Sequence, residues 1–108
     1  DGFAFDAYGN LWITLIMSDK LIALTPDGEV LTLLDDGNPE ATARLNRHFA
    51  DKTLTPEIMQ AARGPLAPWM ASLTFGGPDL RTVYLGSLMG TTIPYFRAPV
   101  AGLPLIHW

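Results

Sequence analysis

The sequence contains no cysteine and few charged residues. Without cysteine, the chain cannot form a disulfide framework, a cysteine-ligated zinc or iron–sulfur site, or a thiol nucleophile. Charged residues make up 17% of the chain, whereas an average soluble domain has about a quarter. Since 48% of the residues are apolar, we expect part of the apolar surface to face further protein.

Basic residues are scarce as well, since seven Lys and Arg are set against eleven Asp and Glu. Nucleic-acid binding needs clustered cations that displace counterions, so no nucleic-acid partner is expected. The longest largely apolar runs, such as residues 11–17, are far shorter than the ~20 residues that span a bilayer. We therefore expect no membrane association, no signal peptide and a cytoplasmic location. Because the chain opens with Asp1 rather than Met, we also expect a processed product or a piece of a longer protein.

Residues 1–34 alternate short apolar runs with turn residues, which predicts a four-stranded antiparallel meander. The four predicted strands lie at about residues 3–6, 11–17, 21–25 and 30–34. Between the last two, Pro26 presets φ and Gly28 accepts a positive φ, so a tight turn is expected there. With 108 residues, the whole chain can build one modest core and not two complete domains.

Residues 35–69 change character and predict a helical insertion and linker, with helix at about 38–64. Asn38 is an N-cap candidate followed by Pro39 and an acidic residue, and Thr55 opens a second start signal of the same kind. The apolar residues of the first helix recur at Ala41, Leu45 and Phe49. Because this stripe is narrow, we expect the insertion to cap a sheet rather than to form a core of its own.

Residues 70–108 return to strand patterns, at about 70–75, 82–87, 91–97 and 105–108, which predicts a second four-stranded meander. The two meanders repeat each other in sequence. Phe3-Ala4-Phe5 matches Leu73-Thr74-Phe75 at an offset of 70 residues, and Leu11-Trp12-Ile13 matches Val83-Tyr84-Leu85 at 72. Residues 21–24 then match residues 93–96, again at an offset of 72.

Without the roughly 30 residues of the helical insertion, the period of the repeat is about 40, the size of a four-stranded propeller blade. The predicted fold class is therefore all-β. We expect one propeller blade at 1–34, the helical insertion and linker at 35–69, and a final blade at 70–108. Two blades are too few to close a ring, so together they form a single partial propeller domain.

Three segments carry a family resemblance. FGGPDLRTVYLGS (residues 75–87) resembles a signature in the last blade of the gluconolactonase, regucalcin (senescence marker protein) and luciferin-regenerating enzyme family. DGFAFDAYGNLWIT (residues 1–14) is similar to the segment that opens the preceding blade, and LIALTPDGEVLTLL (residues 21–34) resembles the outer strands of that blade. The helical insertion departs from the shorter link of regucalcin.

Members of that family are six-bladed propellers that hold a divalent metal, calcium or zinc, and mostly hydrolyse lactones. The resemblance implies that this chain is the C-terminal part of such a metal-dependent lactone hydrolase. The family's metal is held by a Glu and an Asn from earlier blades and by the Asp of an Asp-Gly pair, which matches Asp1-Gly2. The resemblance thus makes Asp1 a metal ligand, leaves the catalytic residues unassigned, and gives upstream propeller blades and a small lactone as partners.

A competing hypothesis is that the chain is a non-catalytic fragment or a self-assembling module without an intact site. Two blades with unpaired flanking faces expose apolar surface, which other copies of the chain can cover. Three copies would supply six blades, so a homo-oligomer is expected in this case. For the chain alone, Asp1 is then a frayed and solvated terminal residue.

The other polar candidates fit structural roles better than catalytic ones. His48 is expected to be a solvated helix residue, and His107 is expected at a half-buried strand position. The Gly76-Gly77-Pro78-Asp79 segment lacks the ending of a phosphate loop and predicts a hairpin turn. No Gly-x-Ser-x-Gly elbow surrounds Ser18, Ser72 or Ser87, so a serine triad has no support.

Aromatic and acidic residues also have structural explanations. Trp12, Phe75 and Tyr84 are expected to pack between adjacent blades rather than to stack on a sugar or a base. Acidic residues in turns are expected to accept hydrogen bonds from their own backbone. These residues are Asp6, Asp27 and Asp79.

Overall fold

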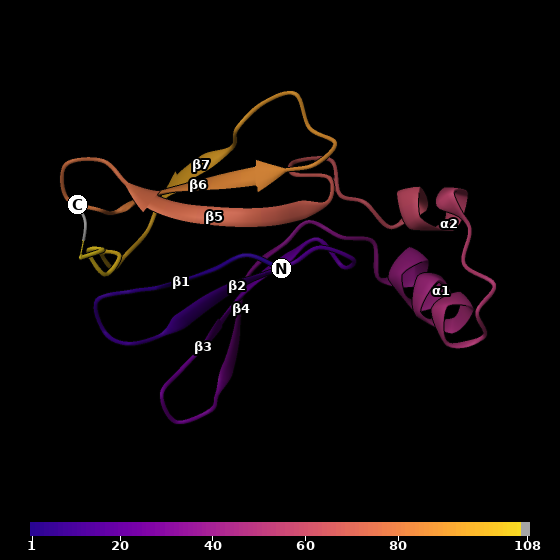
Figure 1. Ribbon diagram of the computed structural model, residues 1–108, viewed down its shortest axis with the longest axis horizontal. Coiled ribbons are helices and arrows are strands. Elements are labelled where there is room, and N and C mark those ends of the chain that lie inside the picture. The colour runs from indigo at the N-terminus through magenta and orange to yellow at the C-terminus, as the bar shows by residue number, and fades with distance from the viewer. Residues whose placement is uncertain (107–108) are drawn as a thin grey trace.

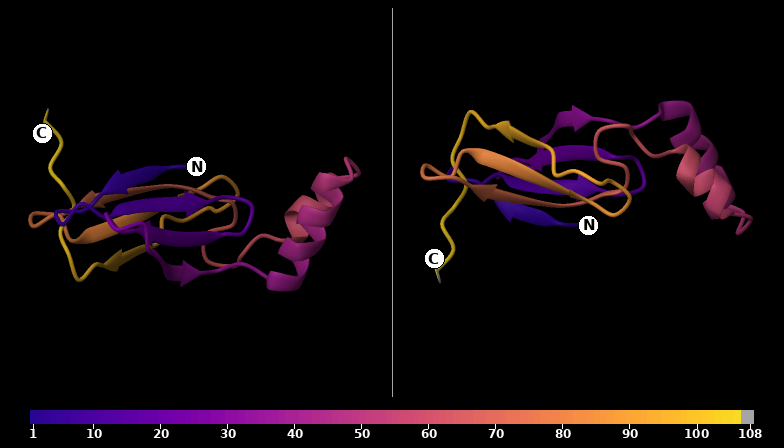
Figure 2. Two further views of the ribbon diagram at one scale, coloured as in Figure 1. Left: turned by 90° about the horizontal axis from the view of Figure 1, so that it is seen from below. Right: turned by 90° about the horizontal axis from the view of Figure 1, so that it is seen from above.

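The computed structural model describes residues 1–106 as two antiparallel sheets and a pair of helices (Figure 1). The first sheet has the order β1-β2-β3-β4, with β1 (Phe3–Phe5), β2 (Leu11–Leu15), β3 (Lys20–Leu24) and β4 (Val30–Asp35). The second sheet has the order β5-β6-β7, with β5 (Met70–Gly76), β6 (Thr82–Ser87) and β7 (Tyr95–Arg97). Figure 2 shows the sheets stacked as layers, with α1 (Pro39–Ala50) and α2 (Pro56–Ala61) beyond one end of the stack. The expected all-β class with a helical insertion is confirmed.

The second sheet has three strands within residues 1–106, where the sequence predicted a four-stranded meander. β7 begins only at Tyr95, because the preceding Pro94 has no N–H with which to continue the ladder. Residues 105–106 of the predicted last strand are not in a strand, and residues 107–108, which include His107, lie outside the described residues.

The chain after β7 crosses to the first sheet instead. The Leu103 N–H donates to the Phe5 carbonyl at 3.0 Å, and the Ala7 N–H donates to the Ala101 carbonyl at 2.8 Å. Asp6 and Gly102 form an antiparallel bridge between these two contacts. The segment 101–103 therefore lies along the edge of β1 that β2 does not cover.

The helices α1 and α2 form a small unit of their own. The Asn38 side chain accepts hydrogen bonds at the start of α1 and the Thr55 side chain does so at the start of α2, so both predicted N-caps are confirmed. Leu45 is buried with residues of α2 in a separate cluster, while Phe49 is 68% exposed. The prediction that the insertion caps a sheet is wrong, because each helix covers the narrow apolar stripe of the other.

The main core lies between the two sheets. Trp12 contributes most from the first sheet: its ring meets Phe75 edge-on at 4.9 Å between centroids and stacks on Phe96 at 6.4 Å. The packing role predicted for Trp12 and Phe75 is thus confirmed, but Tyr84 lies on the outer face of the second sheet and is 37% exposed. The other buried core residues are Leu21, Ala23, Ala67, Met70, Leu73, Val83, Leu85 and Ala98.

Strand pairing supports the sequence repeat. In the first sheet Trp12 lies between Ala4 and Ala23, and in the second sheet Tyr84 lies between Thr74 and Tyr95. These are the partners that the offsets of 70 and 72 residues require. The two sheets therefore share one internal register, although the structure does not show a closed ring of blades.

Asp6 organises the turn between β1 and β2. Its buried carboxylate accepts hydrogen bonds from the backbone N–H groups of Tyr8 at 2.9 Å and Asn10 at 3.0 Å, as the sequence predicted. It also accepts from the Asn10 amide at 2.8 Å and from the Trp12 indole at 3.0 Å. Burial raises the pKa of Asp6, but these four hydrogen bonds outweigh that effect and hold its pKa below the ordinary 3.8.

Asp79 acts in a similar way at the β5–β6 turn. A hydrogen bond from Arg97 lowers its pKa, and the Arg81 N–H donates to the same carboxylate at 3.2 Å. The predicted hairpin turn at residues 76–79 is confirmed, with Gly77 at φ 80°. Asp27 is exposed, and its turn is closed by other hydrogen bonds, among them Gly28 N–H to the Thr25 carbonyl at 2.9 Å.

We expect Asp6→Asn to lower the free energy of unfolding by about 2 kcal/mol at pH 7, because an amide nitrogen would face donors that now meet a carboxylate oxygen. The pKa of Asp6 is lowered on folding, so its stabilisation is fully present above the unfolded pKa and is lost as pH falls through the folded pKa. Urea unfolding from pH 7 to 2.5 should therefore show a smaller acid loss in Asp6→Asn than in the wild type. Asp27→Asn serves as control, and equal acid losses in Asp6→Asn and the wild type would contradict this role.

Candidate functional site

The main chain at Asp1 is held by β2. The amino group of Asp1 donates a hydrogen bond to the Thr14 carbonyl, and the Gly2 N–H donates to Thr14 Oγ1 at 2.9 Å. In return the Thr14 N–H donates to the Gly2 carbonyl at 2.9 Å. Thr14 is fully buried. Asp1 is therefore paired at its backbone and not frayed, while the residue as a whole is exposed.

Gly2 explains why an Asp-Gly pair suits this position. A Cβ at Gly2 would lie 2.7 Å from both the Ala71 carbonyl oxygen and Ser72 Cα, closer than real Cβ atoms approach such groups. Only glycine lets the first residues pass so close to β5 without a shift of backbone. The pair thus places a carboxylate-bearing residue where the edges of the two sheets meet.

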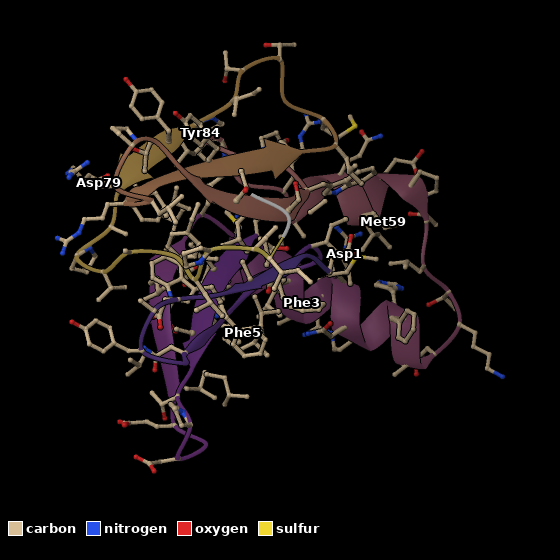
Figure 3. The ribbon with its side chains drawn as sticks, turned by 60° about the vertical axis from the view of Figure 1, so that its left-hand side comes forward. Asp1, Phe3, Phe5, Met59, Asp79 and Tyr84 are labelled. Carbon is tan, nitrogen blue, oxygen red and sulfur yellow. The ribbon has the colours of Figure 1, made fainter. Side chains whose placement is uncertain are left out.

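A hollow beside Asp1 separates the sheets from α1. It is lined by Asp1, by residues 15–18 at the end of β2, and by Thr42 and Asn46 of α1. Figure 3 shows Asp1 at the end of the sheets next to the helical unit. The oxygen-bearing side chains around this hollow are one carboxylate, one amide and the hydroxyls of Ser18 and Thr42.

These donors suit calcium better than zinc. Calcium takes carboxylate, amide and hydroxyl or water oxygens, whereas zinc sites favour Cys and His. No group of three or more His, Cys, Asp or Glu side chains that could hold a metal occurs among residues 1–106. Asp1 is the one carboxylate among the residues that line the hollow, and Leu15, Ile16 and Met17 give it a largely apolar wall.

Of the other sequence candidates, Ser18 lines the same hollow as Asp1, while His48, Ser72 and Ser87 do not. His48 Nδ1 lies 2.7 Å from Thr53 Oγ1, near the C-terminal end of α1. Ser87 Oγ donates to the Pro68 carbonyl and accepts from the Gly90 N–H at 2.8 Å, and Ser72 lies on β5. Within the described part of the chain, none of the three serines is hydrogen-bonded to a histidine.

Sequence reasoning missed Thr42 and Asn46. They are four residues apart and therefore share one face of α1. This spacing could have identified them as neighbours of each other. Their approach to Asp1 depends on where the helical unit lies, which local sequence does not determine.

Comparisons with known proteins add no further assignment: no family model, curated protein or solved structure matches the chain. Among residues 1–106, no helix is both long and apolar enough to cross a membrane.

Proposed function

We propose that the chain is the C-terminal part of a metal-dependent lactone hydrolase of the gluconolactonase type, acting on a cyclic carboxylic ester. The family resemblance of residues 1–14 and 75–87 suggests this class. The observation that carries the proposal is the position of Asp1, whose backbone is fixed by Thr14 and which lines a hollow shared with Ser18, Thr42 and Asn46. The remaining ligands would come from preceding blades.

In this proposal Asp1 would supply one anionic oxygen to a calcium ion, Ser18 a neutral oxygen on the side of the sheets, and Thr42 and Asn46 neutral oxygens on the side of α1. When bound there, a divalent cation would supply Lewis-acid polarisation of an ester carbonyl and charge stabilisation at its oxygen. The task of the present residues is positional: Gly2 allows the close approach to β5, and Thr14 fixes the direction in which Asp1 leaves the sheet.

The test is calcium titration of this chain by calorimetry. With one carboxylate, we expect weak binding, with a dissociation constant of about 10⁻³ M. Asp1→Asn should weaken it at least about tenfold, because it removes the only anionic ligand while keeping the size of the side chain. Asp27→Asn, which removes an exposed carboxylate from a distant turn, should leave binding unchanged. The assignment is wrong if calcium binds wild type no more tightly than Asp1→Asn.

A second candidate function, a self-assembling module, is favoured by a different observation. Large apolar side chains of the first sheet are exposed on its outer face, among them Phe3 at 65% and Phe5 at 47%. These residues belong to the repeat shared by the two sheets, and the repeat indicates what covers them.

A further inference from the structure

The face that is buried differs between the two sheets of the repeat. Residues at matching positions have the same register in the two sheets, yet in several matched pairs one member is buried and the other is exposed. Since side chains alternate between the faces of a strand, the covered face of the first sheet corresponds to the open face of the second. The exposed fractions are Trp12 3% against Tyr84 37%, Ala23 3% against Tyr95 71%, Leu73 8% against Phe3 65%, and Phe75 4% against Phe5 47%.

The two sheets are therefore stacked front to back, and not front to front. We call the face with Trp12 or Tyr84 the front of its sheet and the face with Phe5 or Phe75 the back. The front of the first sheet lies on the back of the second. One front and one back are left open at opposite sides of the stack. Figure 3 shows this arrangement, with Tyr84 on one side of the molecule and Phe3 and Phe5 on the other.

The open face of the first sheet has the composition of a buried one. We call it the phenylalanine face, made of Phe3, Phe5, Leu11, Ile13 and Leu24, which share one side of the sheet by register. Lys20 lies on the same side at the end of β3, where it forms an ion pair with Asp35 of β4. Their counterparts in the second sheet lie in or against the main core, namely Leu73, Phe75, Val83, Leu85 and Phe96.

The open face of the second sheet corresponds to the covered face of the first. We call it the tyrosine face, made of Ser72, Thr74, Tyr84, Ile93 and Tyr95. The rings of Tyr84 and Tyr95 lie 6.0 Å apart, and a hollow beside Tyr84 is lined by Ser72, Thr74 and Ile93. Its residues match the covered face of the first sheet, with Tyr84 at the position of Trp12. Tyrosine supplies a large apolar ring, and its hydroxyl can stay hydrated at the rim of an interface.

We propose that the tyrosine face of one copy of this chain packs on the phenylalanine face of a second copy, head to tail. The occupant is a second copy because the chain already packs these two kinds of face against each other in its own core. Inside the chain Trp12 meets Phe75 edge-on, so Tyr84 of the second copy would meet Phe5 in the same way. Neither face buries an unpaired charge in this contact, and its repetition gives a ring or an open stack. The proposal rests on the second candidate function, the self-assembling module, and on neither the metal nor the lactone.

Light scattering coupled to size-exclusion chromatography, from about 10 to 500 µM, tests this assembly. The wild type should show a mass that rises with concentration. Phe5→Lys and Tyr84→Lys each introduce a charge into one face, so each should raise the dissociation constant at least about tenfold. Phe49→Lys, which changes an exposed apolar residue of α1, should associate like the wild type. Far-UV circular dichroism checks folding, and Phe3→Lys replaces Phe5→Lys if the latter unfolds.

Mixing the two face variants gives the decisive result. Phe5→Lys keeps a good tyrosine face and Tyr84→Lys keeps a good phenylalanine face, so the mixture should form a one-to-one dimer that neither forms alone. A wild type that stays monomeric at every concentration overturns the proposal. A variant that associates alone as tightly as the wild type also overturns it, because it indicates pairing of like faces. A mixture that remains monomeric overturns it as well, since head-to-tail contact requires rescue.

Discussion

Replacing Trp12 with alanine should lower the free energy of unfolding by about 4 kcal/mol, the usual cost of removing a buried tryptophan. Trp12 is the aromatic residue of the first sheet that meets Phe75 and Phe96 of the second. Its removal leaves a cavity between the sheets and takes one donor from the buried Asp6 carboxylate. Urea unfolding followed by circular dichroism measures the change.

The variant Trp12→Phe separates these two effects. It keeps an aromatic ring between the sheets but lacks the indole N–H that Asp6 accepts at 3.0 Å. We expect a loss of about 2 kcal/mol for this variant. If Trp12→Phe is as damaging as Trp12→Ala, then the hydrogen bond to Asp6, and not ring packing, is the main contribution of Trp12. If Trp12→Ala costs less than about 1 kcal/mol, the sheets do not depend on this contact.

Replacing Asp19 with alanine should cost a similar amount, about 4 kcal/mol. The fully buried Asp19 carboxylate accepts hydrogen bonds from the Gly64 N–H and from the Met70 N–H, the latter at 2.8 Å. Alanine leaves both buried N–H groups without an acceptor. Residue 19 also has φ 49°, a left-handed conformation that Asp tolerates better than Ala does. Urea unfolding at pH 7 measures the loss.

Asp19→Asn provides the matched comparison, because asparagine also tolerates the left-handed conformation and keeps one acceptor oxygen. Its loss should be about half that of Asp19→Ala. Asp27→Ala should change stability by less than about 0.5 kcal/mol, because Asp27 is exposed. Equal stability of Asp19→Ala and Asp27→Ala would show that the Asp19 contacts contribute nothing to the fold.

Much of the fold could be predicted where local signals are strong. The strands of the first sheet follow from alternating apolar residues and turn residues, and both helix starts follow from Asn38 and Thr55. The covered face of each sheet could not be predicted, because Val83, Tyr84 and Leu85 are all apolar enough for either side. The pairing of the segment 101–103 with β1 could not be predicted either, because these partners lie about 95 residues apart in sequence.

The candidate site was predictable in part. The resemblance of residues 1–14 selects Asp1, but nothing local brings Thr42 and Asn46 beside it. From the sequence, Asp19 can be predicted only as a turn residue. Its role as an acceptor depends on Gly64 and Met70, which are 45 and 51 residues away. Asp36 behaves in the same way, accepting from Leu66 and Ala67 N–H groups at 2.9 Å. Contacts at such separations depend on the tertiary fold.

The segment 101–103 occupies part of the free edge of β1. An uncovered edge strand exposes N–H and C=O groups that template lateral addition of further strands, the route to fibrous aggregates. The Leu103 N–H is bonded to the Phe5 carbonyl and the Ala101 carbonyl is bonded to the Ala7 N–H, so a strand added here would have to displace this segment. The segment therefore hinders cross-β extension at β1, whereas layering through the open faces needs no such displacement.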